Sequence, residues 1–153
     1  MLKGLILRPV EERDLSHIIR LFVADDLGAT RETLSDPLPQ TYQLAFQEIM
    51  EDKHQALLVV EYKGNIIGTC HLTFIPSLSF QGSRRLNIEN IHVDKNFQNQ
   101  GIGTWMIQRA IAIGQEKGCK IVQLTTNKKR VRAKTFYEKL GFIATHEGMK
   151  LYL

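Results

Sequence analysis

Apolar residues follow two different periods along the chain, and these periods separate expected strands from expected helices. Five apolar side chains between Leu15 and Val23 recur at helical spacing, which predicts a helix from Asp14 to Leu27 that ends before Gly28. The residues at 62–65 include a glycine between two apolar, β-branched runs, which predicts a hairpin. The whole pattern predicts strands at 5–9, 56–61, 66–74, 86–93 and 121–126, helices at 14–27, around Tyr42, Ala45, Phe46 and Ile49, from Gly101 to 117 and at 133–140, and a closing hairpin of 142–145 with 149–153.

These elements give the order β-α-α-β-β-β-α-β-α-β-β, which is typical of a mixed α/β domain. Helices come both before and after the central run of strands, so we expect them to cover both faces of one sheet. The chain has 153 residues, and no linker or internal repeat divides it. We therefore expect a single domain over 1–153.

Composition limits the classes of function. Hydrophobic residues make up 43% and charged residues 24%, which excludes a disordered chain, and the formal charge is only +4. No apolar run approaches the ~20 residues of a membrane span. The N-terminus becomes charged too early for a signal peptide, so we expect a cytoplasmic protein with no membrane partner. Cys70 and Cys119 have no metal or redox spacing, and the five histidines show no ligand spacing, so no metal site is expected.

The most informative segment runs from Asn90 to Thr104, where an apolar strand leads through a polar loop into Gly101 and Gly103. A helix start carries unpaired N–H groups, and glycine lets a ligand approach that backbone, so the segment suits a phosphate or pyrophosphate. Met106 stands where a dinucleotide fingerprint needs glycine, and the Gly-Lys-Ser/Thr of a P-loop is absent. From spacing alone, the simpler explanation of the two glycines is a tight turn and close helix packing.

Two motifs together resemble the GNAT superfamily of N-acetyltransferases. The segment Gln98-Asn99-Gln100-Gly101-Ile102-Gly103 resembles the Q/R-x-x-G-x-G/A motif of that family, and Ile91-His92-Val93-Asp94 is similar to the strand end that precedes it. Downstream, the segment AKTFYEKLGF from Ala133 to Phe142 resembles the second signature, A-x-x-hydrophobic-Y-E-K-L-G-F. The separation of the motifs and the order of the elements also match, and the resemblance covers essentially the whole chain.

The resemblance implies a GNAT-type fold, with a mixed, mostly antiparallel central sheet of six to seven strands flanked by about four helices. It also implies that the strands at 86–93 and 121–126 splay apart and leave a cleft for acetyl-CoA, the acetyl donor. Unpaired strand backbone in such a gap can bind a ligand as an added strand would. The positions that the resemblance assigns to the donor are Ile91, His92, Val93, Gln98, Asn99, Gln100, Gly101, Ile102, Gly103, Thr104, Asn127, Arg130, Ala133, Phe136 and Tyr137.

Tyr137 is the expected catalytic acid. It lies on an apolar stripe with Ala133, Phe136 and Leu140, so periodicity alone explains it as a core aromatic. The matched signature implies instead that its hydroxyl lies near the cofactor sulfur and protonates the departing thiolate. A phenol is a weak acid that arrives protonated near pH 7, which suits this role.

Glu89 is the expected catalytic base. It lies four residues before Val93, where many GNAT enzymes carry a glutamate, and glutamate is uncommon in mid-strand. It could take a proton from the incoming ammonium, directly or through water. An exposed position or an ion pair with a preceding arginine would also explain it. Strand alternation predicts that His92 lies on the opposite face from Glu89, and the side chains of His71 and His92 are interpreted as structural.

A basic run at 128–134 puts five positive charges into seven residues, and the simplest interpretation is a solvated start of a helix. The GNAT resemblance places the run near the phosphates and adenosine of the cofactor. Many members have asparagine where this chain has Arg130, and Asn127 is out of register, so we interpret Arg130 as a substitute that contacts phosphate. The rival interpretation is a nucleic-acid patch, but the run is short and has no interleaved aromatics, so no nucleic-acid partner is expected.

The sequence therefore predicts an acetyl-CoA-dependent N-acetyltransferase that acts on a primary amine of a small molecule or peptide. Direct attack is expected because no cysteine lies in a nucleophile motif, and a strand N–H near His92 would stabilise the oxyanion. The alternative is a non-catalytic acyl-CoA-binding or sensing module on the same fold. The resemblance places Asp25, Asp26 and Arg31 on one wall of the acceptor site, although solvation at the end of a helix explains the two acids as well, and the loop at 76–85 is the other expected wall. The amine itself, and whether the chain forms a homodimer, stay open.

Overall fold

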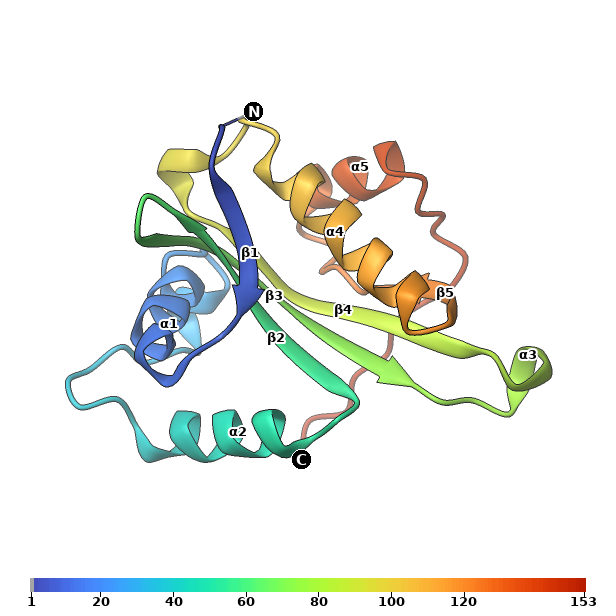
Figure 1. The fold of residues 1–153 in the computed structure, drawn as a ribbon, viewed down its shortest axis with the longest axis horizontal. Coiled ribbons are helices and arrows are strands. Elements are labelled where there is room, and N and C mark those ends of the chain that lie inside the picture. Colours follow the sequence, from blue (N-terminus) through green and yellow to red (C-terminus); the bar gives the residue numbers. More distant parts are fainter. Residues whose placement is uncertain (1) are drawn as a thin grey trace.

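The computed structural model describes residues 2–153, which fold around one five-stranded sheet (Figure 1). The strands lie in the order β1 (Leu5–Pro9), β2 (Gln55–Tyr62), β3 (Asn65–Ile75), β4 (Arg84–Val93) and β5 (Cys119–Gln123). Neighbours are antiparallel except for β4 and β5, which run parallel. Lys63 and Gly64 connect β2 to β3 with φ of 50° and 78°, the positive values that a two-residue hairpin turn requires.

Helices cover both faces of the sheet, as expected. The helix α4 (Ile102–Glu116) buries Met106 and Ile107 against β3 and β4 in the larger core cluster. The helices α1 (Leu15–Val23) and α2 (Gln40–Glu51) pack on the opposite face over a smaller cluster around Leu57 and Val59. The remaining helices are α3 (Ser79–Gly82), a single distorted turn, and α5 (Val131–Lys139), and short 3₁₀ turns lie at Glu12–Asp14, Gly28–Thr30 and Lys95–Phe97. No helix in residues 2–153 is long and apolar enough to cross a membrane.

The strands β4 and β5 pair only where they begin. Their ladder joins the β4 residues from Arg84 to Asn87 with the β5 residues from Cys119 to Gln123, whereas β4 continues to Val93. Beyond Asn87, therefore, β4 has a strand neighbour on one side only within residues 2–153. This confirms the expected separation of 86–93 from 121–126 and leaves strand backbone free for a ligand.

A bulge interrupts β4 just before its free end. Glu89 lies opposite His71 of β3, and His92 lies opposite Thr69. Between these pairs, the two β4 residues Asn90 and Ile91 face the single β3 residue Cys70. Asn90 takes up the extra length with φ of 50°, in the left-handed region that asparagine tolerates better than most residues. The two β3 partners are two residues apart and share a face, so Glu89 and His92 share that face too. The prediction that these side chains lie on opposite faces is therefore wrong.

The first helix is shorter than predicted. It ends at Val23 rather than Leu27, because the chain turns back on itself and brings Gly28 against the helix end. A Cβ at Gly28 would stand only 1.9 Å from the carbonyl oxygen of Phe22. Gly28 is thus required by a close backbone approach and is not the residue that ends the helix.

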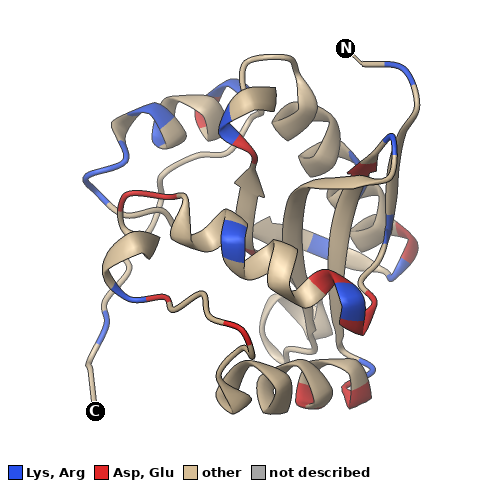
Figure 2. Ribbon diagram, turned by 90° about the vertical axis from the view of Figure 1, so that its left-hand side faces the viewer, with Lys and Arg blue, Asp and Glu red and all other residues tan. Residues whose placement is uncertain are grey.

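The closing hairpin predicted at 142–145 and 149–153 does not form, so the sheet has five strands instead of six to seven. These residues are coil, and Ile143, Met149 and Leu151 expose 81%, 94% and 87% of their surface. Figure 2 shows the C-terminal end of the chain leading away from the rest of the molecule. Alternating apolar residues form a strand only beside a neighbouring strand, and within residues 2–153 this segment has none.

Candidate active site

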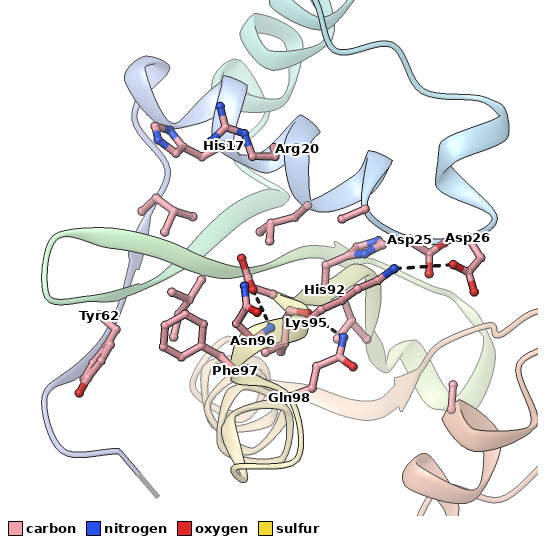
Figure 3. A pocket seen from close by; sticks show the side chains of 18 of the residues that line it. His17, Arg20, Asp25, Asp26, Tyr62, His92, Lys95, Asn96, Phe97 and Gln98 are labelled. Atoms are coloured by element: carbon pink, nitrogen blue, oxygen red, sulfur yellow. Dashed lines mark hydrogen bonds and ion pairs between the residues drawn. The ribbon is translucent and has the colours of Figure 1, made fainter.

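A cleft of about 1290 Å³ lies at the free end of β4, where α1, the 3₁₀ turn after β4 and the start of α5 come together (Figure 3). Its lining includes 91–98 from β4 and the following turn, and 129–133 from the start of α5. The predicted cofactor residues on this lining are Ile91, His92, Val93, Gln98, Arg130 and Ala133. The remaining predicted site residues do not line it.

The turn at 98–104 leads into α4 with a strained backbone. Asn99 and Gly101 have φ of 60° and 82°, and Gly101 is the N-cap. The first helical hydrogen bond is donated by the Trp105 N–H to the Gly101 carbonyl at 3.0 Å. Within residues 2–153, the N–H groups of residues 102–104 have no acceptor, and no side chain caps them. Three free N–H groups at the positive end of a 15-residue helix fit a pyrophosphate.

Polar side chains hold this turn in place. The Gln98 Nε2 donates to the Val93 carbonyl at 2.9 Å, and the Gln100 Nε2 donates to the Asn96 carbonyl at 3.2 Å. The Asp94 carboxylate accepts from the Asn96 N–H at 2.8 Å. Because both glutamine side chains already donate to backbone carbonyls, a ligand at this turn would be bound mainly by backbone N–H groups.

Gly103 allows α4 and α5 to approach closely. A Cβ at Gly103 would stand 3.4 Å from the Phe136 Cζ, a contact at the tight end of the normal range. Phe136 also lines a smaller hollow of about 340 Å³ with Val131 and Thr135. Close helix packing, which the sequence left as one explanation of this glycine, is therefore present.

Tyr137 lies between two aromatic rings at the edge of the larger core. Its ring centroid is 5.1 Å from that of Phe136 and 5.9 Å from that of Phe142, both edge-on. Burial raises the pKa of the phenol above its ordinary value, and the nearby charge of Arg130 opposes the rise. The hydroxyl is therefore protonated at neutral pH, as a proton donor must be.

Glu89 is exposed on β4, directly opposite His71 of β3. The ion pair with a preceding arginine does not form, because Arg84 donates to the Lys117 carbonyl at 3.1 Å and Arg85 donates to the Ser77 hydroxyl at 3.4 Å. His71 is buried, and burial lowers its pKa, although the Glu89 charge opposes this. Its Nε2 has no hydrogen-bond partner within residues 2–153.

His92 presents its side chain to the cleft, a role that the sequence did not assign to it. Its ring centroid lies 4.8 Å from that of Phe22 on α1, with the planes tilted by 50°. Burial lowers the pKa of the imidazole, and the charge of Asp25 opposes this. Strand parity alone could not find this side chain, because the bulge at Asn90 reverses the parity.

Arg130 and Asp25 form an ion pair across the cleft, and both line it. The Asp25 carboxylate also accepts from the N–H groups of Leu27 and Gly28 at 3.1 and 3.0 Å. Burial opposes ionisation of Asp25, but the Gly28 N–H and the Arg130 charge outweigh it and hold the pKa below its ordinary value. Arg130 is thus already paired with a carboxylate at the position where we expect it to meet phosphate.

The other expected site residues are distributed unevenly. Asp26 lines the cleft and lies 3.7 Å from the Lys95 Nζ, whereas Arg31 pairs with Glu32 at 3.2 Å and does not line it. Asn127 accepts from the Lys129 N–H with its side chain at 2.9 Å and does not line it either. The loop at 76–85 lies at the opposite end of β4 (Figure 1).

Sequence reasoning missed several cleft residues on distant elements. Arg20 comes from α1 and Lys63 from the β2–β3 turn, and both line the cleft with Lys95. Only Lys95 stands near a recognisable motif. Arg20 and Lys63 reach the site only because the sheet brings their elements together, so no local signal marks them.

Comparisons with known proteins agree with this geometry. Residues 21–142 match the acetyltransferase (GNAT) family. The chain is 30% identical over 152 residues to the glucosamine 6-phosphate N-acetyltransferase of Trypanosoma brucei brucei, covering 96% of this chain and 95% of that one. A crystal structure of a transcriptional regulator from Bacillus halodurans C-125 superposes with a TM-score of 0.96 at 40% identity, covering 98% of this chain and 100% of that one. A Trypanosoma brucei acetyltransferase gives a TM-score of 0.78 at 30% identity, covering 98% and 100%.

The chain therefore belongs to the GNAT family of acetyltransferases. It is an acyltransferase that uses acetyl-CoA as its acetyl donor. The free edge of β4 and the free N–H groups of α4 suit the extended arm and the pyrophosphate of that donor.

Proposed function

We propose that the protein transfers the acetyl group of acetyl-CoA to a primary amine of a small molecule by direct attack. The observation that carries this proposal is that the unpaired end of β4 lines the cleft and that the turn after it, which lines the cleft as far as Gln98, leads within a few residues to the three free N–H groups of α4. A ligand with an extended polar arm and a pyrophosphate can satisfy both sets of backbone groups at once.

In this proposal the backbone at 91–93 holds the pantetheine arm, and the turn at 98–104 holds the pyrophosphate. Arg130 reaches a phosphate by leaving Asp25, while Asn127, Ala133 and Phe136 border the donor. The ion pair and the phosphate compete for one guanidinium, so occupation by the donor would free the Asp25 carboxylate.

Acetyl-CoA supplies an acetyl group activated as a thioester. The chain must then remove a proton from the attacking ammonium, stabilise an oxyanion and protonate the departing sulfur. We assign the first task to Glu89, which receives the proton directly, through water or through a neighbouring side chain, and the second to a strand N–H near His92. Tyr137 performs the third, because its half-buried phenol remains protonated at neutral pH.

We further propose that the acceptor is an amine that also carries an anionic group. The cleft places the cations Arg20, Lys63 and Lys95 together with the carboxylates of Asp25 and Asp26. Carboxylates attract the ammonium and the cations attract the anion. The relative from T. brucei that acetylates glucosamine 6-phosphate, an amino sugar phosphate, covers almost the whole chain and supports this class.

The test is free-thiol release from acetyl-CoA with glucosamine 6-phosphate, with glucosamine as the matched control and with a lysine peptide as a third acceptor. We expect glucosamine 6-phosphate to exceed glucosamine in kcat/KM by about tenfold or more, because the cations at the cleft attract the phosphate that glucosamine lacks. Tight CoA binding without turnover of any amine would instead support the non-catalytic acyl-CoA module.

Nucleic-acid binding is less well supported. The relative from B. halodurans is described as a transcriptional regulator, and the basic run at 128–134 is the surface that would contact nucleic acid. Three of its charges are already paired, in Lys128–Glu147 at 3.5 Å, Arg130–Asp25 and Lys134–Glu138 at 3.7 Å. DNA affinity that falls steeply with salt and excludes CoA would contradict our proposal.

A further inference from the structure

The bulge in β4 creates a relationship between Glu89 and His92 that strand alternation hides. Their partners on β3 are two residues apart on one face, so the Cα atoms of Glu89 and His92 lie about 7 Å apart along that face. His92 lines the cleft, whereas Glu89 is exposed and does not line it. Of the two, His92 is therefore the side chain that an amine in the cleft meets first.

The surroundings of His92 hold its ring and set its charge. Phe22 packs against the imidazole from α1. Figure 3 shows the side chain of His92 pointing toward Asp25, beyond the end of that helix. The charged groups facing it are Asp25 after α1, Arg130 at the start of α5, and Arg31 and Glu32 in the loop after the Gly28–Thr30 turn. Burial exceeds the influence of the two carboxylates and lowers the pKa, so the imidazole is neutral and able to accept a proton at pH 7.

We propose that His92 is a catalytic residue, the general base that takes the proton from the ammonium of the acceptor, and that Glu89 then passes this proton to solvent. One N–H bond of the ammonium breaks, and its electron pair stays on the amine nitrogen, which becomes the nucleophile. A new N–H bond forms on the imidazole, and the imidazolium afterwards releases the proton to Glu89 or to water. This inference rests on the proposed function and specifies how its first proton transfer occurs.

Kinetics with glucosamine 6-phosphate or another turned-over amine distinguish this assignment from a base role for Glu89 alone. We expect His92→Gln to lower kcat by about 10²–10⁴-fold, the usual contribution of a positioned base. It should also move the acidic limb of the pH–rate profile to the pKa of the acceptor amine. Glu89→Gln should cost about tenfold or less, because water can still receive the proton. The matched control is His17→Gln, since His17 also lines the cleft but lies on α1.

A second measurement needs no acceptor. Diethyl pyrocarbonate modifies neutral, accessible imidazoles, and mass spectrometry locates the modified histidines. We expect His92 to react at pH 7 and to be protected by CoA, whereas exposed His146 should react equally with and without CoA. Absence of CoA binding by calorimetry would contradict the proposed function itself. If CoA binds but His92 stays unreactive or unprotected, or if His92→Gln keeps the wild-type rate and pH profile, His92 is not the base.

Discussion

Arg130 and Asp25, which are 105 residues apart in the sequence, form an ion pair that joins the start of α5 to the chain that follows α1. The same carboxylate accepts the N–H groups of Leu27 and Gly28, so it also shapes the turn after α1. The Asp25 carboxylate thus connects the start of α5 to the turn after α1, which are two walls of the cleft. A ligand that pairs with Arg130 would therefore remove one of the contacts that hold the turn after α1 in place.

Asp25→Asn should lower the free energy of unfolding by about 1–2 kcal/mol, because the Arg130 guanidinium and two N–H groups lose a charged acceptor. The value is modest because the Asp25 and Arg130 side chains are 22% and 31% exposed, and solvent weakens the pair. Urea unfolding measures the change. Asp26→Asn is the matched control, because the Asp26 side chain is 99% exposed, and a similar loss there would show that Asp25 has no special role.

Arg130→Ala should weaken CoA binding, and the loss should shrink at high salt, which already screens the charge. Asp25→Asn should leave CoA affinity equal or higher, since it frees the guanidinium for phosphate. Isothermal calorimetry with CoA at low and high salt checks both variants. Unchanged affinity in Arg130→Ala would mean that Arg130 serves only the ion pair.

Substitutions at the two glycines of the α4 turn should act differently. Gly101→Ala forces a side chain into a left-handed conformation with φ of 82° and should cost about 1–2 kcal/mol. Gly103 has ordinary helical geometry, so Gly103→Ala should fold normally, whereas Gly103→Val should press on Phe136 and weaken CoA binding. Thermal unfolding and CoA calorimetry separate the effects. Wild-type CoA affinity in folded Gly103→Val would place the pyrophosphate elsewhere.

Tyr137→Phe should keep the fold, because the ring still packs between Phe136 and Phe142. Turnover should fall by about 10²–10⁴-fold if the hydroxyl protonates the sulfur, while CoA affinity stays near that of the wild type. Because burial raises the pKa of the phenol, its deprotonation should not limit the wild-type rate below pH 10. Full activity in Tyr137→Phe would remove the residue from the mechanism.

Stability should fall in two stages as the pH decreases. His71 and His92 have lowered pKa values, so the unfolded chain takes up protons near the ordinary value of 6.5 before the folded chain does, and stability is lost below that pH. Asp14 and Asp25 also have lowered values, which adds a second loss below their ordinary value of 3.8. Urea midpoints across this range measure both. His71→Gln should flatten the first stage, and His146→Gln, at an exposed position, should not.

The central elements could be predicted because their patterns are local. The strands from β1 to β4 and the helix α4 follow from alternation, helical spacing and turn residues within a few positions. The pairing of Asp25 with Arg130 depends on distant chain that no local period records. The end of α1 depends on the backbone of Gly28 packing against Phe22, which apolar spacing does not show. The prediction of a C-terminal hairpin was wrong for a related reason. Alternation at 149–153 shows that the segment could form a strand, but it does not show that another strand lies beside it.

The bulge at Asn90 divides β4 into two lengths with opposite parity. Leu86 and Ile88 face the larger core before it, and Ile91 and Val93 face the same core after it. A strand that continued regularly through Asn90, without the bulge, would turn every residue beyond it to the other face. His92 would then enter the apolar core, and Ile91 and Val93 would face the opposite layer. At this position, the one extra residue in β4 decides the direction of His92 as much as the identity of any side chain does.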